Sequence, residues 1–147
     1  MSTLKEIPAS LTYAIRQELL RPGRPPEECI FPGDTAASTF HLGVYDDDDS
    51  LLAVASYMRS SSEKFIEKDQ YQLRGMAVLQ QFKNKGLGAM LLLGGEDKIR
   101  SMERPYILWF NARDYAVGFY EKYGYKTIGG KFVIPDLCEH IVMYKYL

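Results

Sequence analysis

The chain has 147 residues, of which 46% are hydrophobic and 13% aromatic, so it can form one domain around its own core. Its 18 Lys and Arg residues nearly balance 19 Asp and Glu residues. The net charge of -1 provides no broad basic surface for nucleic acid or for an anionic membrane, so any anion-binding site must be local.

Targeting signals and cysteine usage point to an ordinary intracellular setting. No window approaches the roughly 20 apolar residues of a membrane-spanning helix, and the first ten residues lack the features of a secretion signal. Cys29 and Cys138 are far apart and match no metal-ligand spacing, which is typical of reduced thiols. We therefore expect a cytoplasmic protein without a bound metal or a membrane partner.

The first predicted element is a helix. Leu11, Ile15 and Leu19 recur at four-residue steps, and Ser10 can accept hydrogen bonds from the first free amides. A helix is therefore expected over residues 10–20, and the following RPGRPP stops it.

The next segments indicate a loop and a hairpin. Residues 27–38 contain proline and glycine without a clear period, which predicts a loop or a short irregular helix that is free to line a site. Residues 39–45 and 51–58 are strand-like and are separated by Asp46–Asp49. Consecutive carboxylates on a loop rarely converge on a cation, so a solvated acidic turn is expected.

The second half of the chain alternates strands and helices. Residues 71–79 predict a strand in which Gly75 marks a bulge or a close backbone approach. A glycine-containing segment comes next. It is followed by a predicted strand at residues 106–112, a short helical pattern, and closing strands at residues 125–129 and 140–147. This order predicts an α/β fold of the α+β kind, with helices packed on a mixed sheet.

The segment QQFKNKGLGAMLL, residues 81–93, contains two glycines flanked by lysines and followed by an apolar run. Leu91 stands where a dinucleotide fingerprint needs its third glycine, and no GxxxxGK phosphate loop is present. Gly86 and Gly88 would lie at the start of a helix, where free amides, the helix dipole and nearby ammonium groups favour a pyrophosphate. The alternative is a solvated basic loop.

The segment AVLQQFKNKGLGAMLL resembles the acetyl-coenzyme A motif of the GNAT superfamily of N-acetyltransferases. That motif has Arg or Gln, two residues, Gly, one residue, then Gly or Ala, and Lys83 is a departure at its first position. The downstream NARDYAVGFYEKYGY resembles the second family motif at Ala116, Phe119, Tyr120, Gly124 and Tyr125. LRPGRPPEECIFPGD and FHLGVY also resemble a bacterial subgroup of unassigned substrate.

The resemblance implies one N-acetyltransferase domain over residues 1–147. Its expected fold is a mixed, mostly antiparallel twisted sheet of six to seven strands, flanked by about four helices, with the central strands splayed at the coenzyme site. The implied reaction is direct transfer of an acetyl group from acetyl-CoA to a primary amine.

The resemblance also implies a set of acetyl-CoA contacts. Backbone amides of residues 85–89 would hold the pyrophosphate, and the strand at residues 76–78 would pair with the pantetheine arm. Asn111 or Arg113 would contact the pantetheine. The full expected set is Met76, Ala77, Val78, Lys83, Asn84, Lys85, Gly86, Leu87, Gly88, Ala89, Asn111, Arg113, Ala116, Phe119 and Tyr120.

The family match assigns Tyr120 as the general acid that protonates the departing thiolate. The general base stays open, because Gln72 occupies the place where some family members carry a glutamate. The candidates are His41, His140, Glu67 and Asp69, directly or through water.

The second substrate is not encoded in a recognised motif. Arg74 could bind a substrate carboxylate or pair with an acidic neighbour. Acceptor contacts are expected from residues 27–34, the hairpin and the C-terminal strands, and the acceptor is a small-molecule or protein amine. The sheet edge often dimerises in this superfamily, so a homodimer is one expected assembly.

Three other functions compete with acetyl transfer. The first is a non-catalytic acyl-CoA-binding sensor or interaction module, and the second is transfer of a longer acyl group. The third is nucleic-acid binding by the lysine-rich loop, which the net charge disfavours.

Overall fold

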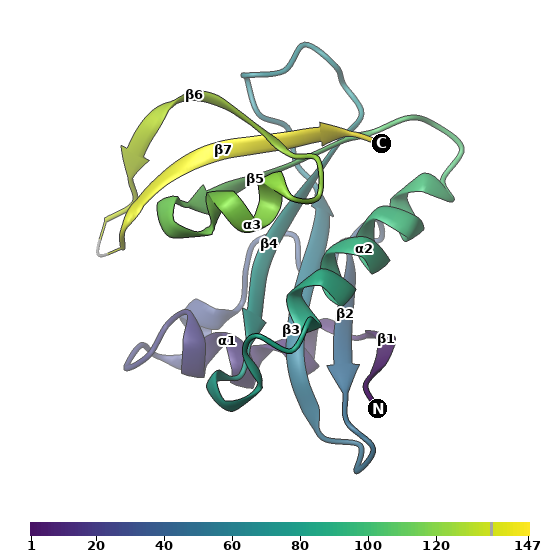
Figure 1. The fold of residues 1–147 in the computed structure, drawn as a ribbon, viewed down its shortest axis with the longest axis vertical. Coiled ribbons are helices and arrows are strands. Elements are labelled where there is room, and N and C mark those ends of the chain that lie inside the picture. The colour runs from purple at the N-terminus through teal and green to yellow at the C-terminus, as the bar shows by residue number, and fades with distance from the viewer. Residues whose placement is uncertain (136) are drawn as a thin grey trace.

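The computed structural model describes residues 1–135 and 137–147, which form one seven-stranded sheet (Figure 1). The strand order is β1-β2-β3-β4-β5-β7-β6, and only β4 and β5 are parallel neighbours. The mixed, mostly antiparallel sheet expected from the sequence is thus confirmed. The strands are β1 (Thr3–Ile7), β2 (Phe40–Tyr45), β3 (Leu51–Arg59), β4 (Gln70–Val78), β5 (Ile107–Arg113), β6 (Lys126–Val133) and β7 (Glu139–Tyr146).

Three α-helices pack on this sheet, where about four helices were expected. They are α1 (Tyr13–Leu19), α2 (Leu87–Arg100) and α3 (Val117–Glu121). Single 3-10 turns are η1 (Ala9–Thr12), η2 (Pro26–Cys29), η3 (Gln80–Phe82) and η4 (Asp114–Ala116). The segment 27–38 forms no α-helix, and Pro32 within it lacks the amide hydrogen that a longer helix requires.

The N-terminus differs from the sequence-based expectation in two ways. The predicted helix over residues 10–20 begins as the 3-10 turn η1, and α1 starts only at Tyr13, so Ser10 does not cap it. Residues 3–7 form the edge strand β1, which pairs with β2 and was not predicted. Only Ile7 of that strand is buried, so its sequence lacks a clear apolar alternation.

The two faces of the sheet carry different helices. Leu91, Leu92 and Ile99 of α2 are fully buried against one face, while Ile15 of α1 packs against the other. A side chain at Gly95 would collide with the Tyr57 ring, so this glycine allows α2 to lie close to β3.

The β2–β3 hairpin ends in the expected acidic turn. The Asp46 carboxylate accepts hydrogen bonds from the amides of Asp48 and Ser50, at 2.8 and 2.9 Å, so it closes the turn itself. No helix in residues 1–135 or 137–147 is both long and apolar enough to cross a membrane.

Candidate active site

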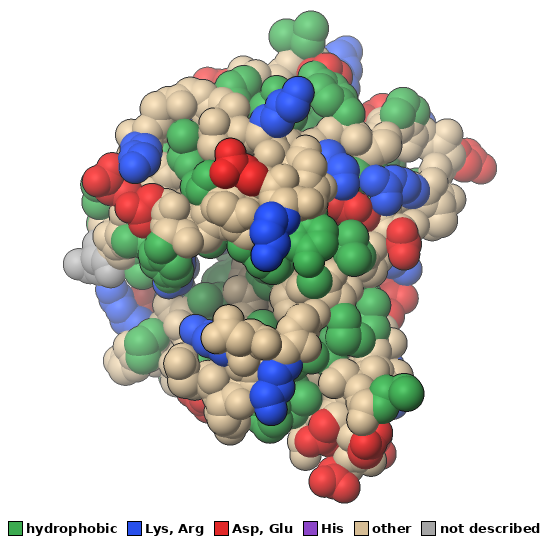
Figure 2. Space-filling view, in the orientation of Figure 1, with side chains coloured by type: hydrophobic (Ala, Val, Ile, Leu, Met, Phe, Trp, Pro, Cys, Tyr) green, Lys and Arg blue, Asp and Glu red, His purple; other side chains and the backbone are tan. Residues whose placement is uncertain are grey.

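The parallel strands β4 and β5 separate after a short contact, and this separation opens the sheet. They pair only where Gln70–Gln72 face Ile107–Trp109, and their remaining residues have no partner in the other strand. A cavity of about 930 Å³ occupies the gap, and Figure 2 shows it as a hollow with Lys and Arg side chains on both sides. The expected splaying of the central strands is therefore present.

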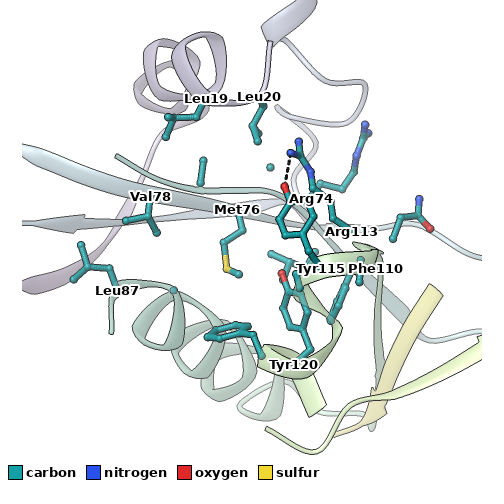
Figure 3. Close-up of a pocket in the computed structure, with 18 of the residues that line it drawn as sticks. Leu19, Leu20, Arg74, Met76, Val78, Leu87, Phe110, Arg113, Tyr115 and Tyr120 are labelled. Atoms are coloured by element: carbon teal, nitrogen blue, oxygen red, sulfur yellow. Dashed lines mark hydrogen bonds between the residues drawn. The ribbon is translucent and has the colours of Figure 1, made fainter. Parts of the chain in front are cut away.

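Gly75 forms the expected bulge in β4. Val54 faces Ala77 and Ser56 faces Arg74, so two residues of β4 lie opposite one residue of β3. Gly75 has a φ of 63°, and a side chain there would approach the Phe31 ring to 3.0 Å. The bulge changes which side chains of β4 face the cavity, and Met76 projects into it (Figure 3).

The start of α2 forms one wall of the cavity. Gly86 is the N-cap residue with a φ of 81°, and within the described chain no side chain caps the first amides of this helix. Asn84 also has a positive φ, at 62°, so the turn before the helix is tightly wound. Free amides at the positive end of a 14-residue helix, with Lys83 beside them, suit a phosphate group.

Gly86→Ala is expected to raise the KM for acetyl-CoA about tenfold, because a left-handed alanine costs roughly 1–2 kcal/mol and would shift the amides of the turn. Gly23→Ala is the matched control, since Gly23 has a φ of 75°, has open space around it and does not line the cavity. Steady-state kinetics that show the same KM in both variants would contradict a phosphate-binding role of this turn.

The cavity brings together almost the whole set of residues expected to bind the coenzyme. Each member lines it except Lys85, whose ammonium nitrogen lies 5.7 Å from the centre of the Phe82 ring. Asn111 and Arg113 both line the cavity from β5, so the geometry does not choose between them.

Tyr120 lies at the inner end of the cavity and is buried. Its ring packs against Phe110, at 4.2 Å between ring centres, and against Phe119, at 5.1 Å. Figure 3 shows its hydroxyl directed into the cavity on the side where Met76 projects. Burial raises the pKa of Tyr120, so the phenol keeps its proton at neutral pH and can act as an acid.

Of the four candidate bases, His140 alone lines the cavity. It lies on β7 directly opposite Arg113 of β5, so both side chains belong to the same sheet face. The His140 Nδ1 is 2.7 Å from the Cys138 carbonyl oxygen. Because a carbonyl only accepts, Nδ1 carries the hydrogen, and neutral His140 has its lone pair on Nε2.

The other three candidates are held elsewhere. His41 uses both ring nitrogens, toward Ser56 Oγ at 2.6 Å and the Asp34 carbonyl at 2.9 Å. Glu67 accepts a hydrogen bond from the Tyr146 hydroxyl, and Asp69 pairs with Arg59 and with a second arginine. None of the three lines the cavity, so a direct role for them as the base is not supported.

Cavity residues from the end of α1 were not predicted from the sequence, whereas Phe31 lies in the segment 27–34, from which acceptor contacts were expected. Leu19 and Leu20 approach from the end of α1 (Figure 3). Arg21 follows them in the chain, and both Arg21 and Phe31 line the cavity as well. Tyr115 stands at the mouth with 73% of its surface exposed, and its hydroxyl accepts a hydrogen bond from Arg113. Arg21 belongs to the segment RPGRPP, for which the sequence predicted only the end of a helix.

Three arginines surround the Phe31 ring. The guanidinium carbons of Arg16, Arg74 and Arg21 lie 3.9, 4.5 and 5.9 Å from its centre. Arg16 takes up the nearby Asp34 carboxylate, but no ion pair or hydrogen bond joins Arg74 to another described side chain. Burial and the charges of Arg16 and Arg21 lower the pKa of Arg74, so this place favours an incoming anion.

The cavity thus combines a gap between parallel strands with a helix start that suits a phosphate group. The comparisons agree, because residues 31–147 match the acetyltransferase (GNAT) domain family. The chain is also 38% identical over its full length to the uncharacterized N-acetyltransferase YitI of Bacillus subtilis, of which it covers 97%. The chain therefore belongs to the GNAT acetyltransferase family, whose members use acyl-CoA.

Solved structures support the fold. The ribosomal-protein-S18-alanine N-acetyltransferase of Escherichia coli has a TM-score of 0.75 and 18% identity, with 99% of this chain and 94% of that one covered. An aminoglycoside 6'-N-acetyltransferase complexed with coenzyme A has a TM-score of 0.70 and 16% identity, with 98% and 96% covered. At these identities the likeness establishes the architecture and not the acceptor.

Proposed function

We propose that this protein transfers an acetyl group from acetyl-CoA directly to a primary amine. The observation that carries the proposal is the single cavity that joins the uncapped start of α2 to Tyr120 and His140. Acyl donor, proton acceptor and proton donor can therefore meet in one place, which is the requirement for direct transfer.

The two titratable side chains supply the proton transfers. His140 Nε2 accepts a proton from the amine as its nitrogen bonds to the thioester carbonyl carbon. The backbone at the Gly75 bulge is the proposed donor to the carbonyl oxygen as negative charge develops there. The carbon–sulfur bond then breaks, Tyr120 Oη donates its proton to the sulfur, and solvent returns a proton from His140 to Tyr120.

The charges on the sheet face of His140 favour an acceptor that also carries an oxyanion. Arg21, Arg74 and Arg113 line the cavity, and Glu18 is the one described carboxylate that does so. Arg16 occupies the Asp34 carboxylate, and no ion pair joins Arg21 or Arg74 to another described residue. A carboxylate or phosphate on the acceptor would balance them through charge-assisted hydrogen bonds.

Arg74→Gln is expected to lower kcat/KM for β-alanine about 10–100-fold and to leave β-alaninamide nearly unchanged, since a hydrogen bond to a charged group contributes roughly 1.5–3 kcal/mol. The rate of thiol release from acetyl-CoA measures kcat/KM for both amines. Arg104→Gln is the control, because it removes the same charge from an exposed pair with Asp69 outside the cavity. Equal losses for the two amines would exclude an anion-binding role.

Thiol release from acetyl-CoA with a panel of amines tests the proposal as a whole. Among amines of matched size, the carboxylated and the phosphorylated members should both be acetylated faster than the neutral member. Binding of acetyl-CoA without turnover of any amine would instead favour the sensor module. A parallel panel of propionyl, butyryl and longer donors decides the acyl group.

A further inference from the structure

A completely buried arginine lies against Phe31, one of the residues that line the cavity. The Arg16 side chain is 0% exposed, and its guanidinium binds both Asp34 carboxylate oxygens, at 2.6 and 2.9 Å. It also donates to the Cys29 carbonyl and to Ser56 Oγ, each at 2.8 Å. One side chain of α1 therefore connects the loop at residues 29–34 to the central strand β3.

These bonds hold both ends of that short loop. The Cys29 carbonyl and the Asp34 carboxylate are bound by the same guanidinium, and Asp34 in turn accepts a hydrogen bond from the Phe31 amide at 2.8 Å. Burial opposes the charge on Asp34, but hydrogen bonds from Arg16 and from the Phe31 amide outweigh it and lower the pKa of Asp34. Asp34 thus stays ionised and the loop stays closed on Arg16.

Phe31 is the residue that this closed loop presents to the cavity. Its ring lies on the Arg16 guanidinium, and the Arg74 guanidinium lies 4.5 Å from the ring centre on the cavity side of β4. The ring also lies close to the Gly75 bulge, where an added side chain would approach it to 3.0 Å. The direction of the Arg74 side chain therefore depends on where the ring is held.

Stability alone is a weak reason for this arrangement. A buried ion pair has to repay the desolvation of both charges, and apolar side chains of similar volume often stabilise a protein as well. The Arg16 Nε–H has no hydrogen-bond partner among the described residues, which adds to that cost. In some proteins such buried pairs specify a conformation, and the segment that Arg16 holds here is the loop at residues 29–34.

We infer that Arg16 and Asp34 are positioning residues for the acceptor. These two residues fix the loop at residues 29–34 and thereby the position of the Phe31 ring. The Arg74 guanidinium packs on that ring, which directs it into the cavity. The inference rests on the proposed acetyl transfer. Arg16 and Asp34 do not line the cavity, so they would influence acceptor affinity only through Phe31 and Arg74.

The test is a double-mutant cycle between Asp34→Asn and Arg74→Gln, with the carboxylated amine of highest kcat/KM as acceptor. We expect Asp34→Asn to raise the acceptor KM about tenfold, with kcat and the acetyl-CoA KM within about twofold of wild type. In the Arg74→Gln background the same change should add less than about twofold, because Asp34 acts through Arg74. Independent effects that multiply, or an equal rise in the acetyl-CoA KM, would overturn the inference.

Two further variants separate positioning from general stability. Glu96→Gln is the matched control, because Glu96 is also a buried carboxylate, bound by Tyr125 and Lys145 outside the cavity. It should lower the Tm without changing the acceptor KM. Phe31→Leu keeps the ion pair and removes the ring, so it should reproduce the rise in acceptor KM and also fail to add to Arg74→Gln. If Asp34→Asn does not fold, this second cycle decides.

A binding measurement distinguishes failure of this inference from failure of the proposed reaction. Succinate and inorganic phosphate are titrated calorimetrically into protein saturated with coenzyme A, so that the start of α2 is already filled. Wild type should bind at least one of the two anions, and Asp34→Asn and Phe31→Leu should bind it about tenfold more weakly. A wild type that transfers no acetyl group refutes the reaction, whereas absent or equal anion binding refutes the positioning role.

Discussion

His140→Asn is expected to lower kcat about 10²–10³-fold, because a positioned general base contributes on that order to a proton-transfer step. The asparagine amide can still donate to the Cys138 carbonyl, as His140 Nδ1 does, but it offers no basic nitrogen at the place of Nε2. The acetyl-CoA KM should stay close to that of wild type. Steady-state thiol release with acetyl-CoA varied at saturating amine measures both constants.

Cys138→Ala is the control for His140→Asn. It changes the neighbouring side chain and keeps the backbone carbonyl that orients the imidazole, so its kcat should match that of wild type. Wild-type turnover in His140→Asn would remove the base role, and a water chain to a more distant carboxylate would then have to be sought.

Tyr120→Phe is expected to lower kcat about 10²-fold and to leave the acetyl-CoA KM nearly unchanged. The ring and its packing on Phe110 and Phe119 are kept, so only the proton delivered to the sulfur is lost. Tyr123→Phe is the matched control, since Tyr123 also lines the cavity just after α3. Equal kinetics in the two variants would exclude an acid role for Tyr120.

The pH dependence of Tyr120 has a definite sign. A raised pKa means that the folded protein holds the phenolic proton more firmly than water does, so the acid form persists to higher pH. If kcat decreases as the pH is raised toward about 9, loss of the Tyr120 proton is therefore not the cause. The shape of the kcat profile up to that pH should be the same for wild type and Tyr120→Phe.

The two variants together separate an enzyme from a coenzyme sensor. Both keep the start of α2, so a sensor would bind acetyl-CoA equally well in each and would show no turnover to lose. Loss of turnover with retained binding in both variants would place the proton transfers on His140 and Tyr120.

Local chain geometry made the coenzyme side of the site predictable. Gly86 and Gly88 follow a strand and begin an amphipathic helix, and the structure has this helix starting at Leu87 with a left-handed Gly86 before it. The bulge at Gly75 was predicted for the same reason, since glycine in a strand interior signals a backbone that no side chain tolerates. Both features depend on residues close together in the chain.

The acceptor side could not be predicted in the same way. His140 was one of four candidate bases, and only the pairing of β5 with β7 brings it beside Arg113 and the cavity. Arg16 lies within the helix predicted over residues 10–20. The buried face of that helix was predicted from its leucines and isoleucine, so a buried arginine was not expected. Its partners Asp34 and Ser56 are 18 and 40 residues away.

The order of glycines, lysines and apolar residues therefore predicted the family resemblance and the helix that begins after Gly86, because both depend on residues close together in the chain. The place of His140 at the cavity, the cluster of arginines around Phe31 and the loop held by Arg16 became visible only in the tertiary packing. They depend on which side chains meet across strands and loops, and that is fixed by register and burial over the whole chain.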